Sequence, residues 1–177
     1  MALHLKWFTF NPFSENTYIL YGDNKECILF DPGCSNASEE ITILKFIEEK
    51  QLKPIRLILT HAHIDHVLGV RFICQKFNLK LEMHEADLPV YDSAGTIARM
   101  YGIPFNQGPQ PEVFLDEKSE IELDGFMLEI FHTPGHSPGS ICFYSKHNNF
   151  VIGGDVLFNG SIGRTDLPGG DFETLSN

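Results

Sequence analysis

Residues 57–70 read LILTHAHIDHVLGV and place His61, His63, Asp65 and His66 in six positions directly after an apolar run. Several imidazoles and a carboxylate are costly to desolvate, so such a cluster indicates either a solvated surface or a metal site. Residues two apart in an extended chain project to the same side, so His61 and His63 can face one ion beyond the strand end. Asp65 and His66 lie where the chain turns into a helix and can face a second ion, although Asp65 can also serve only as an N-cap.

The composition limits the classes of protein to consider. The chain has 177 residues, of which 42% are hydrophobic, and no tract of eighteen consecutive apolar residues, which predicts one soluble globular domain over residues 1–177. Its net charge of −11 disfavours nucleic acid and anionic membranes as partners and leaves a small molecule as the expected one. The first residues, MALHLKWFTF, lack the pattern of a signal peptide, so we expect a cytoplasmic location.

The four cysteines do not follow metal-binding or redox spacing. Cys27, Cys74 and Cys142 lie inside apolar runs, which predicts buried thiols. Cys34, in the polar stretch DPGCSN, is the one expected to be exposed.

The order of strands and helices predicts sheets packed together with helices outside them. Strand patterns cover residues 3–10, 17–22, 26–33 and 55–60, and a helix is expected over 36–52 with a buried stripe of Ile41, Leu44 and Ile47. A second helix is expected over 65–78, followed by a strand over 79–86. Residues 87–111 are rich in Gly and Pro and carry no clear pattern, and strands broken by turns return after residue 119.

Two later segments carry further candidate ligands. TPGHSPGS (133–140) places His136 in a turn bounded by Pro and Gly, which can hold an imidazole rigidly at a sheet edge. FVIGGDVLF (150–158) places Asp155 after two glycines that leave room for a close approach, and its two oxygens can bridge two cations. The remaining histidines, His4, His84, His132 and His147, are expected to be structural or surface residues.

Taken in this order, FDPG (30–33), HAHIDH (61–66), TPGHSPGS and GGDVLF resemble the metallo-β-lactamase fold hydrolases. The resemblance implies an α/β fold, a four-layer αββα sandwich with the metal site at one edge of the two sheets. It implies that one zinc is held by His61, His63 and His136, that a second is held by Asp65 and His66, and that Asp155 bridges them. Asp31 would then orient a ligand or the loop from outside the ligand set, or act only as a turn residue before Pro32.

One departure from the family pattern affects the second metal. The family supplies a further histidine from a Gly-His-Gly type turn near the C-terminus, whereas the 22 residues after Asp155 contain no histidine. The chain also stops at DFETLSN, where a helix is expected to begin. We therefore expect a C-terminally truncated form of a longer protein, with two zinc ions in the full-length chain and iron or manganese as alternatives.

The ligands predict a reaction type more firmly than a substrate. A hydroxide bound to two metals attacks a carbonyl carbon, and Asp65 is the candidate catalytic residue that orients it. NGSIGRTDLPGGD (159–171) resembles the short glyoxalase II-like branch, the hydroxyacylglutathione hydrolases that cleave the thioester S-lactoylglutathione. Arg164, the one basic residue of this stretch, either meets a substrate carboxylate or pairs with Asp166 or Asp171 as a structural clip.

Three alternatives remain at the level of sequence. A persulfide dioxygenase of the same fold also carries a Gly-Arg-Thr-Asp stretch and would hold one iron through His61, His136 and Asp155. A nuclease of the superfamily is disfavoured by the acidic charge and by the lack of a basic run. A metal-binding protein without turnover is the third, because the last ligand is missing.

Overall fold

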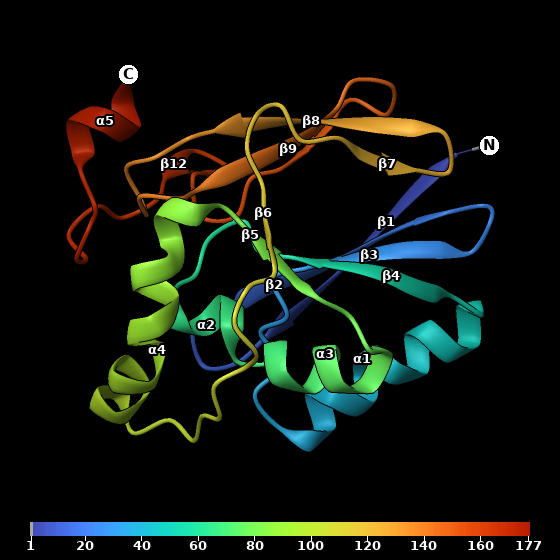
Figure 1. The fold of residues 1–177 in the computed structure, drawn as a ribbon, viewed down its shortest axis with the longest axis horizontal. Helices are drawn as coiled ribbons and strands as arrows, with labels where there is room; N and C mark the ends of the chain where they lie inside the picture. Colours follow the sequence, from blue (N-terminus) through green and yellow to red (C-terminus); the bar gives the residue numbers. More distant parts are fainter. Residues whose placement is uncertain (1) are drawn as a thin grey trace.

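Two β-sheets packed face to face form the centre of the structure, a computed structural model that describes residues 2–177 (Figure 1). The larger sheet has six strands in the order β1-β2-β3-β4-β5-β6, antiparallel up to β3 and parallel from β3 onwards. Its strands are β1 Leu3–Phe10, β2 Glu15–Gly22, β3 Glu26–Phe30, β4 Lys53–Ile58, β5 Leu81–Met83 and β6 Val113–Phe114.

The second sheet has four antiparallel strands in the order β10-β9-β8-β7. Its strands are β7 Ile121–Leu123, β8 Phe126–His132, β9 Ile141–Ser145 and β10 Phe150–Ile152, and a separate two-stranded ribbon consists of β11 Leu157–Phe158 and β12 Ser161–Ile162. The helices are α1 Ala37–Lys50, α2 Ile64–Val67, α3 Val70–Phe77, the 3₁₀ helix η1 Glu85–Asp87, α4 Leu88–Tyr101 and α5 Phe172–Ser176.

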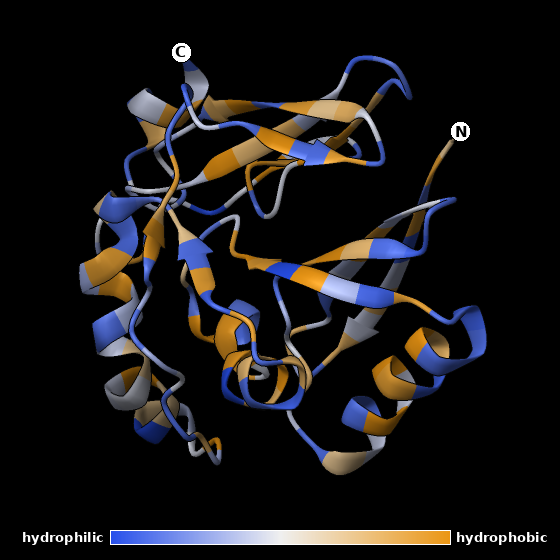
Figure 2. Ribbon diagram, turned by 45° about the vertical axis from the view of Figure 1, so that its right-hand side comes forward, coloured by the Kyte–Doolittle hydropathy of each residue, from blue (hydrophilic) through white to orange (hydrophobic). Residues whose placement is uncertain are grey.

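The two sheets share one hydrophobic core, and the larger sheet and the helices share another. Strand residues alternate between the two faces, so Ile28 and Phe30 of β3 point to the second sheet while Leu29 points to the helices. Phe30 is completely buried, and its ring centroid lies 5.0 Å from that of Phe143 on β9. Figure 2 shows hydrophobic residues along the strands of both sheets, interspersed with hydrophilic ones.

Helix α1 agrees with the sequence in its cap but not in its buried stripe. Asn36 is the N-cap, and its side chain accepts hydrogen bonds from the backbone N–H groups of Ser38 and Glu39. The predicted stripe is confirmed at Ile47, which is buried, but it is wrong at Ile41, which is 49% exposed, because the other buried residue of α1 is Ile43. The apolar residues of this helix span more than one face, so spacing alone did not fix which face is buried.

The single helix expected over 65–78 is two helices, α2 and α3, separated at Leu68 and Gly69. The backbone N–H of Gly69 donates to the carbonyl oxygen of Pro32 at 2.7 Å, which draws the chain against the loop after β3. A Cβ atom at Gly69 would lie 2.3 Å from the sulfur of Cys34, so only glycine fits here. The close contact between these two loops is therefore the reason for the break.

Two further segments differ from expectation. The unassigned stretch 87–111 contains α4, a helix of 14 residues with Pro89 in its first turn and Gly102 as a left-handed C-cap. Cys34 is buried rather than exposed, because the loop contact with Gly69 covers it, and all four cysteines are buried and free.

The architecture is a mixed α/β fold with two sheets, as the sequence predicted. Helices α1 and α3 cover the outer face of the larger sheet, and α4 lies at one end of it (Figure 1). Beside the second sheet, residues 2–177 supply one short helix, α5, where the sequence DFETLSN predicted a helix to begin. Within residues 2–177, no helix has the length and apolar character needed to cross a membrane.

The contact between the sheets gives a stability prediction. Phe30→Ala removes a buried ring from both the intersheet core and the Phe143 contact, so we expect a loss of about 3–5 kcal/mol in the free energy of unfolding. Phe131→Ala on β8 is the matched control, because that ring is 44% exposed. Urea denaturation of both variants checks this, and equal losses would contradict the described core.

Candidate metal centre

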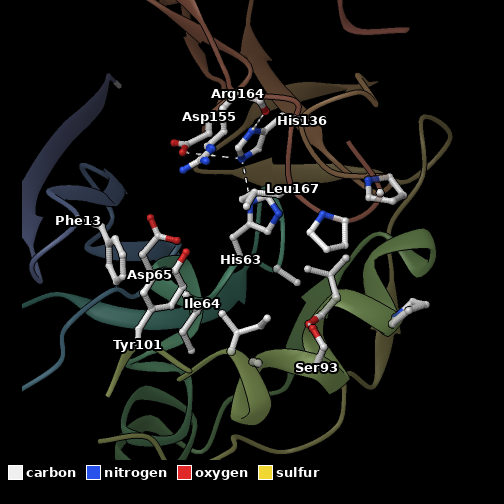
Figure 3. Close-up of a pocket in the computed structure, with 18 of the residues that line it drawn as sticks. Phe13, His63, Ile64, Asp65, Ser93, Tyr101, His136, Asp155, Arg164 and Leu167 are labelled. Atoms are coloured by element: carbon white, nitrogen blue, oxygen red, sulfur yellow. Dashed lines mark hydrogen bonds and ion pairs between the residues drawn. The ribbon is translucent and has the colours of Figure 1, made fainter. Parts of the chain in front are cut away.

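Three loops meet at one edge of the two sheets and bring the candidate residues together. The loop after β4 carries His61 and His63 and leads into α2, which carries Asp65 and His66. The β8–β9 loop carries His136, and the segment between β10 and β11 carries Asp155. Figure 3 shows His63, His136 and Asp155 on one wall of a cavity, with Asp65 close by.

His61, His63 and His136 form a first group of possible metal ligands. His136 Nε2 lies 2.8 Å from His63 Nδ1 and 3.1 Å from His61 Nε2. Burial, together with the neighbouring imidazoles, lowers the pKa of His63 to about 3, so this imidazole is neutral at pH 7. Three imidazole nitrogens therefore converge on one point without a carboxylate between them.

The hydrogen bonds behind two of these rings fix their tautomers. The carbonyl oxygen of Arg164 can only accept, so His136 Nδ1 donates to it at 2.7 Å. The hydroxyl of Thr60 donates to Asp31 Oδ2 at 2.6 Å, which leaves its oxygen free to accept from His61 Nδ1 at 3.1 Å. Nε2 of both rings then carries a lone pair, and two lone pairs 3.1 Å apart fit a cation between them.

Asp65, His66 and Asp155 form a second group. His66 is buried, and its Nε2 lies 3.6 Å from Asp65 Oδ2 and 3.4 Å from Asp155 Oδ1, both longer than a hydrogen bond. Burial by itself lowers the pKa of His66, but the carboxylates of Asp31, Asp155 and Asp65 outweigh it and raise that pKa well above its usual value. The second group therefore attracts positive charge, which suits a divalent cation.

Asp155 lies between the two groups. Its Oδ1 faces His66 of the second group, and its Oδ2 lies 3.8 Å from His136 Nε2 of the first. The approach depends on Gly154, whose φ is +51° and whose added Cβ would lie 2.2 Å from the hydroxyl oxygen of Thr60. Of the two glycines singled out in the sequence, Gly154 is the one that the close approach requires.

Asp31 lies next to both ligand groups and, with His61 and His66, forms a third group of possible metal ligands. Its Oδ1 accepts from the backbone N–H of Thr60 at 2.7 Å, and its Oδ2 lies 3.1 Å from His66 Nδ1. Asp31 also has a left-handed backbone, with φ of +48°, which is uncommon outside glycine and occurs at constrained sites. Asp31 is thus in contact with a candidate ligand as well as being the residue before Pro32.

For Asp65 and Arg164 the sequence left open a purely structural role beside the functional one. Asp65 is not an N-cap, because α2 begins at Ile64 and His63 is the residue before it. Arg164 lines the cavity, and its guanidinium donates to both oxygens of Asp166, each at 2.7 Å. This pairing is the structural clip that the sequence offered as one of two roles for Arg164.

The four remaining histidines lie outside both groups. His4 Nε2 lies 3.0 Å from Asp23 Oδ1, and the ring of His147 packs 4.7 Å from that of Phe126. His84 and His132 stack with centroids 4.2 Å apart, and His132 Nε2 lies 2.9 Å from the carbonyl oxygen of Pro138.

Asp87 is a positioning residue that the sequence did not reveal. It is completely buried, and its Oδ2 accepts from the backbone N–H of Ala62, between His61 and His63, at 2.7 Å. Its Oδ1 accepts from the Ser137 hydroxyl at 2.6 Å and from the Gly139 N–H at 2.5 Å, in the loop of His136. One carboxylate thus holds two ligand loops together. The sequence did not reveal this role, because residues 87–111 are rich in Gly and Pro and carry no clear pattern.

Glu15 is a second residue that the sequence did not single out. It is 4% exposed, its Oε2 accepts from the Thr17 hydroxyl at 3.0 Å, and its Oε1 is buried without a hydrogen-bond partner among residues 2–177. Burial raises the pKa of Glu15 well above its usual value, and the nearby Asp31 raises it further against the lowering effect of His66. In the metal-free protein this carboxyl therefore holds its proton above the pH at which an exposed glutamate loses it.

A cavity of about 800 Å³ opens beside both ligand groups. His63, Asp65, His136 and Asp155 line one side of it, as Figure 3 shows. Helix α4 and residues 167–169 supply much of the rest. This volume lies within the range of small-molecule binding sites, about 300–1,000 Å³.

Comparison with known proteins agrees with this geometry. The sequence profile described as "Metallo-beta-lactamase superfamily" matches residues 10–177. The chain is 38% identical over 175 residues to the probable metallo-hydrolase YqgX of Bacillus subtilis, covering 97% of this chain and 80% of that protein. It is 38% identical over 165 residues to the hydroxyacylglutathione hydrolase GloC of Haemophilus influenzae, covering 92% and 76%.

A solved structure shows a similar fold. The crystal structure of TTHA1623 in a di-iron-bound form superposes with a TM-score of 0.84 at 36% identity, covering 97% of this chain and 82% of that one.

The role of Asp87 can be tested by Asp87→Asn. The Asp87 carboxylate accepts three hydrogen bonds, and the NH₂ of an asparagine cannot accept any. At least one of the three is therefore lost, and we expect a loss of about 1–3 kcal/mol in the free energy of unfolding. Because the ligand loops lose their common anchor, zinc affinity should fall about 10- to 100-fold. Asp92→Asn, at an exposed position of the following helix α4, is the control, and unchanged zinc affinity in a folded Asp87→Asn protein would refute the role.

The buried Glu15 gives a prediction on pH. Its pKa is higher in the folded than in the unfolded protein, so its contribution to stability is present at low pH and is lost as the pH rises above about 4.3. Glu15→Gln cannot ionise, so its stability relative to the parent should grow with pH, by up to about 1.4 kcal/mol per unit. Urea denaturation in chelator at pH 5 and pH 8, with the exposed Glu129→Gln as control, measures this difference. A difference that is the same at both pH values would contradict it.

Proposed function

Because this chain belongs to the metallo-beta-lactamase superfamily, we propose that it is a metal-dependent hydrolase of thioesters such as S-lactoylglutathione, with zinc as the metal. The observation that carries the proposal is the division of Asp155 between two ligand groups, Oδ1 towards His66 and Oδ2 towards His136. In this proposal His61, His63 and His136 hold one cation, Asp65 and His66 hold the other, and Asp155 contacts both.

Two divalent cations in these positions would lower the pKa of water and polarise a carbonyl group, which is the chemistry of hydrolysis. The side chains around them orient and move protons. The Arg164 carbonyl orients His136, while Asp31 acts on His61 through Thr60, so both imidazoles keep Nε2 free for the site.

Asp65 is the proposed catalytic residue. It lies on the cavity wall, and burial raises the pKa of its carboxyl, although His66 opposes this shift. Its carboxylate can accept a hydrogen bond from an attacking water and so orient it.

The substrate is supported by similarity to one named enzyme and by the negative net charge of the chain. GloC, at 38% identity, is a hydroxyacylglutathione hydrolase, a name that denotes hydrolysis of a glutathione thioester. The net charge of −11 favours a small molecule over nucleic acid as partner. Four free cysteines agree with a reducing compartment such as the cytoplasm, which we include in the proposal.

A second candidate is an iron-dependent persulfide dioxygenase with His61, His136 and Asp155 as ligands. The di-iron form of TTHA1623 supports iron as an alternative metal for this fold. Oxygen uptake by the iron-loaded protein with glutathione persulfide, without thioester hydrolysis, would favour this candidate over the first.

The proposal is tested by Asp155→Ala, with zinc content and S-lactoylglutathione hydrolysis measured on the same preparation. Removing the carboxylate shared by both groups should lower zinc affinity and kcat/KM by about a hundredfold or more. His147→Ala is the matched control, since this exposed histidine lies outside both groups. Zinc retained at the parent stoichiometry in Asp155→Ala refutes the shared role, and a zinc-loaded parent protein that hydrolyses no thioester refutes the function.

A further inference from the structure

The cavity beside the metal centre is apolar away from the ligands. Its α4 wall includes Val90, Ser93, Ala94 and Ile97, and Pro138 and Leu167 add further apolar lining. The hydroxyl of Ser93 donates to the carbonyl of Val90 at 2.8 Å within the same helix, so its proton is already engaged. Figure 3 shows Ser93 on the side of the cavity opposite His136 and Asp155.

Large apolar side chains also gather at the mouth of the cavity. Phe13, Met100 and Tyr101 line it with exposures of 40%, 77% and 55%. The rings of Phe13 and Tyr101 meet edge to face with centroids 5.4 Å apart. Exposed apolar residues grouped around a concave site mark a surface that an apolar ligand covers.

Beyond the ligand groups, the cavity offers no free cation to an anionic ligand. Arg164, the one Lys or Arg among its lining residues, is paired with both oxygens of Asp166. The tripeptide half of a glutathione thioester carries two carboxylates, for which the cavity walls offer no free cation. The acyl half is the part of such a substrate that the walls suit.

We infer that this cavity is an acyl-binding site that selects thioesters with an extended apolar acyl group, the tripeptide lying outside it. The inference rests on the proposed thioesterase function and narrows its substrate class. The metal ligands at one end and the apolar walls beyond them place a carbonyl carbon at the ligands when the acyl chain lies along α4. Burial of each further methylene then favours binding by on the order of threefold.

Binding and hydrolysis are measured separately. Calorimetry on the metal-free chain compares S-octylglutathione with S-methylglutathione, two thioethers that cannot be hydrolysed and differ only in the apolar group. The octyl compound has seven more methylenes, so it should bind about a thousandfold tighter if all are buried and about tenfold tighter if only two are buried. On the zinc-loaded chain, kcat/KM should rise from S-acetyl- through S-hexanoyl- to S-octanoylglutathione.

Two pairs of variants locate the site. Ser93→Phe fills the cavity from α4 and should reduce the octyl-to-methyl affinity ratio to about one, whereas Ser38→Phe, at an exposed position of α1, should leave it unchanged. Ile97→Gln makes the wall polar at similar size and should lower the ratio, with the exposed Ile41→Gln as its control.

The outcomes separate the two proposals. Equal binding of the octyl and methyl compounds, or a preference that Ser93→Phe leaves intact, overturns the acyl site even if thioesters are hydrolysed. A preference for the octyl compound without hydrolysis of any thioester overturns the thioesterase function, and the acyl assignment with it. Chain-length preference in both measurements, lost in Ser93→Phe, supports both.

Discussion

The convergence of three imidazoles, with His136 Nε2 lying 2.8 Å from His63 Nδ1 and 3.1 Å from His61 Nε2, is the constraint on which the rest of the site depends. Such a cluster is unfavourable in a dry interior unless each ring is held and its free lone pair faces a cation. The backbone carbonyl of Arg164 and the hydroxyl of Thr60 hold two of the rings, and the buried carboxylate of Asp87 holds the loops that carry them. In the second group the pKa shift has the opposite direction. Three carboxylates surround His66 and raise its pKa, so this group attracts positive charge.

The two sheets make this convergence possible because their ends meet at one edge. Residues from the loops after β3 and β4 approach from the larger sheet, and those after β8 and β10 approach from the smaller one. The intersheet core around Phe30 and Phe143 fixes the distance between these two sets of loops. Loops fixed by a rigid scaffold are the usual carriers of binding and catalytic groups, and here each sheet supplies part of the same centre.

Much of the fold and most of the candidate site could be predicted from the sequence. The close spacing of His61, His63, Asp65 and His66 indicates a metal site. The motifs around His136 and Asp155 supply the other candidate ligands. The misses share a physical cause, since Asp87, Glu15 and the break at Gly69 depend on contacts between segments distant in the chain. Ile41 and Cys34 were misjudged for the same reason, because which side of a helix or loop is covered is decided by its neighbours.

The central claim is that one carboxylate joins two ligand groups, and crystallographic location of the metals tests it most directly. Crystals of the zinc-loaded protein, measured on both sides of the zinc absorption edge, give an anomalous difference map of the site. The account predicts one peak among His61, His63 and His136, a second among Asp65, His66 and Asp155, and the Asp155 carboxylate between them. A single peak with Asp155 turned away from it, or zinc bound elsewhere, would contradict it.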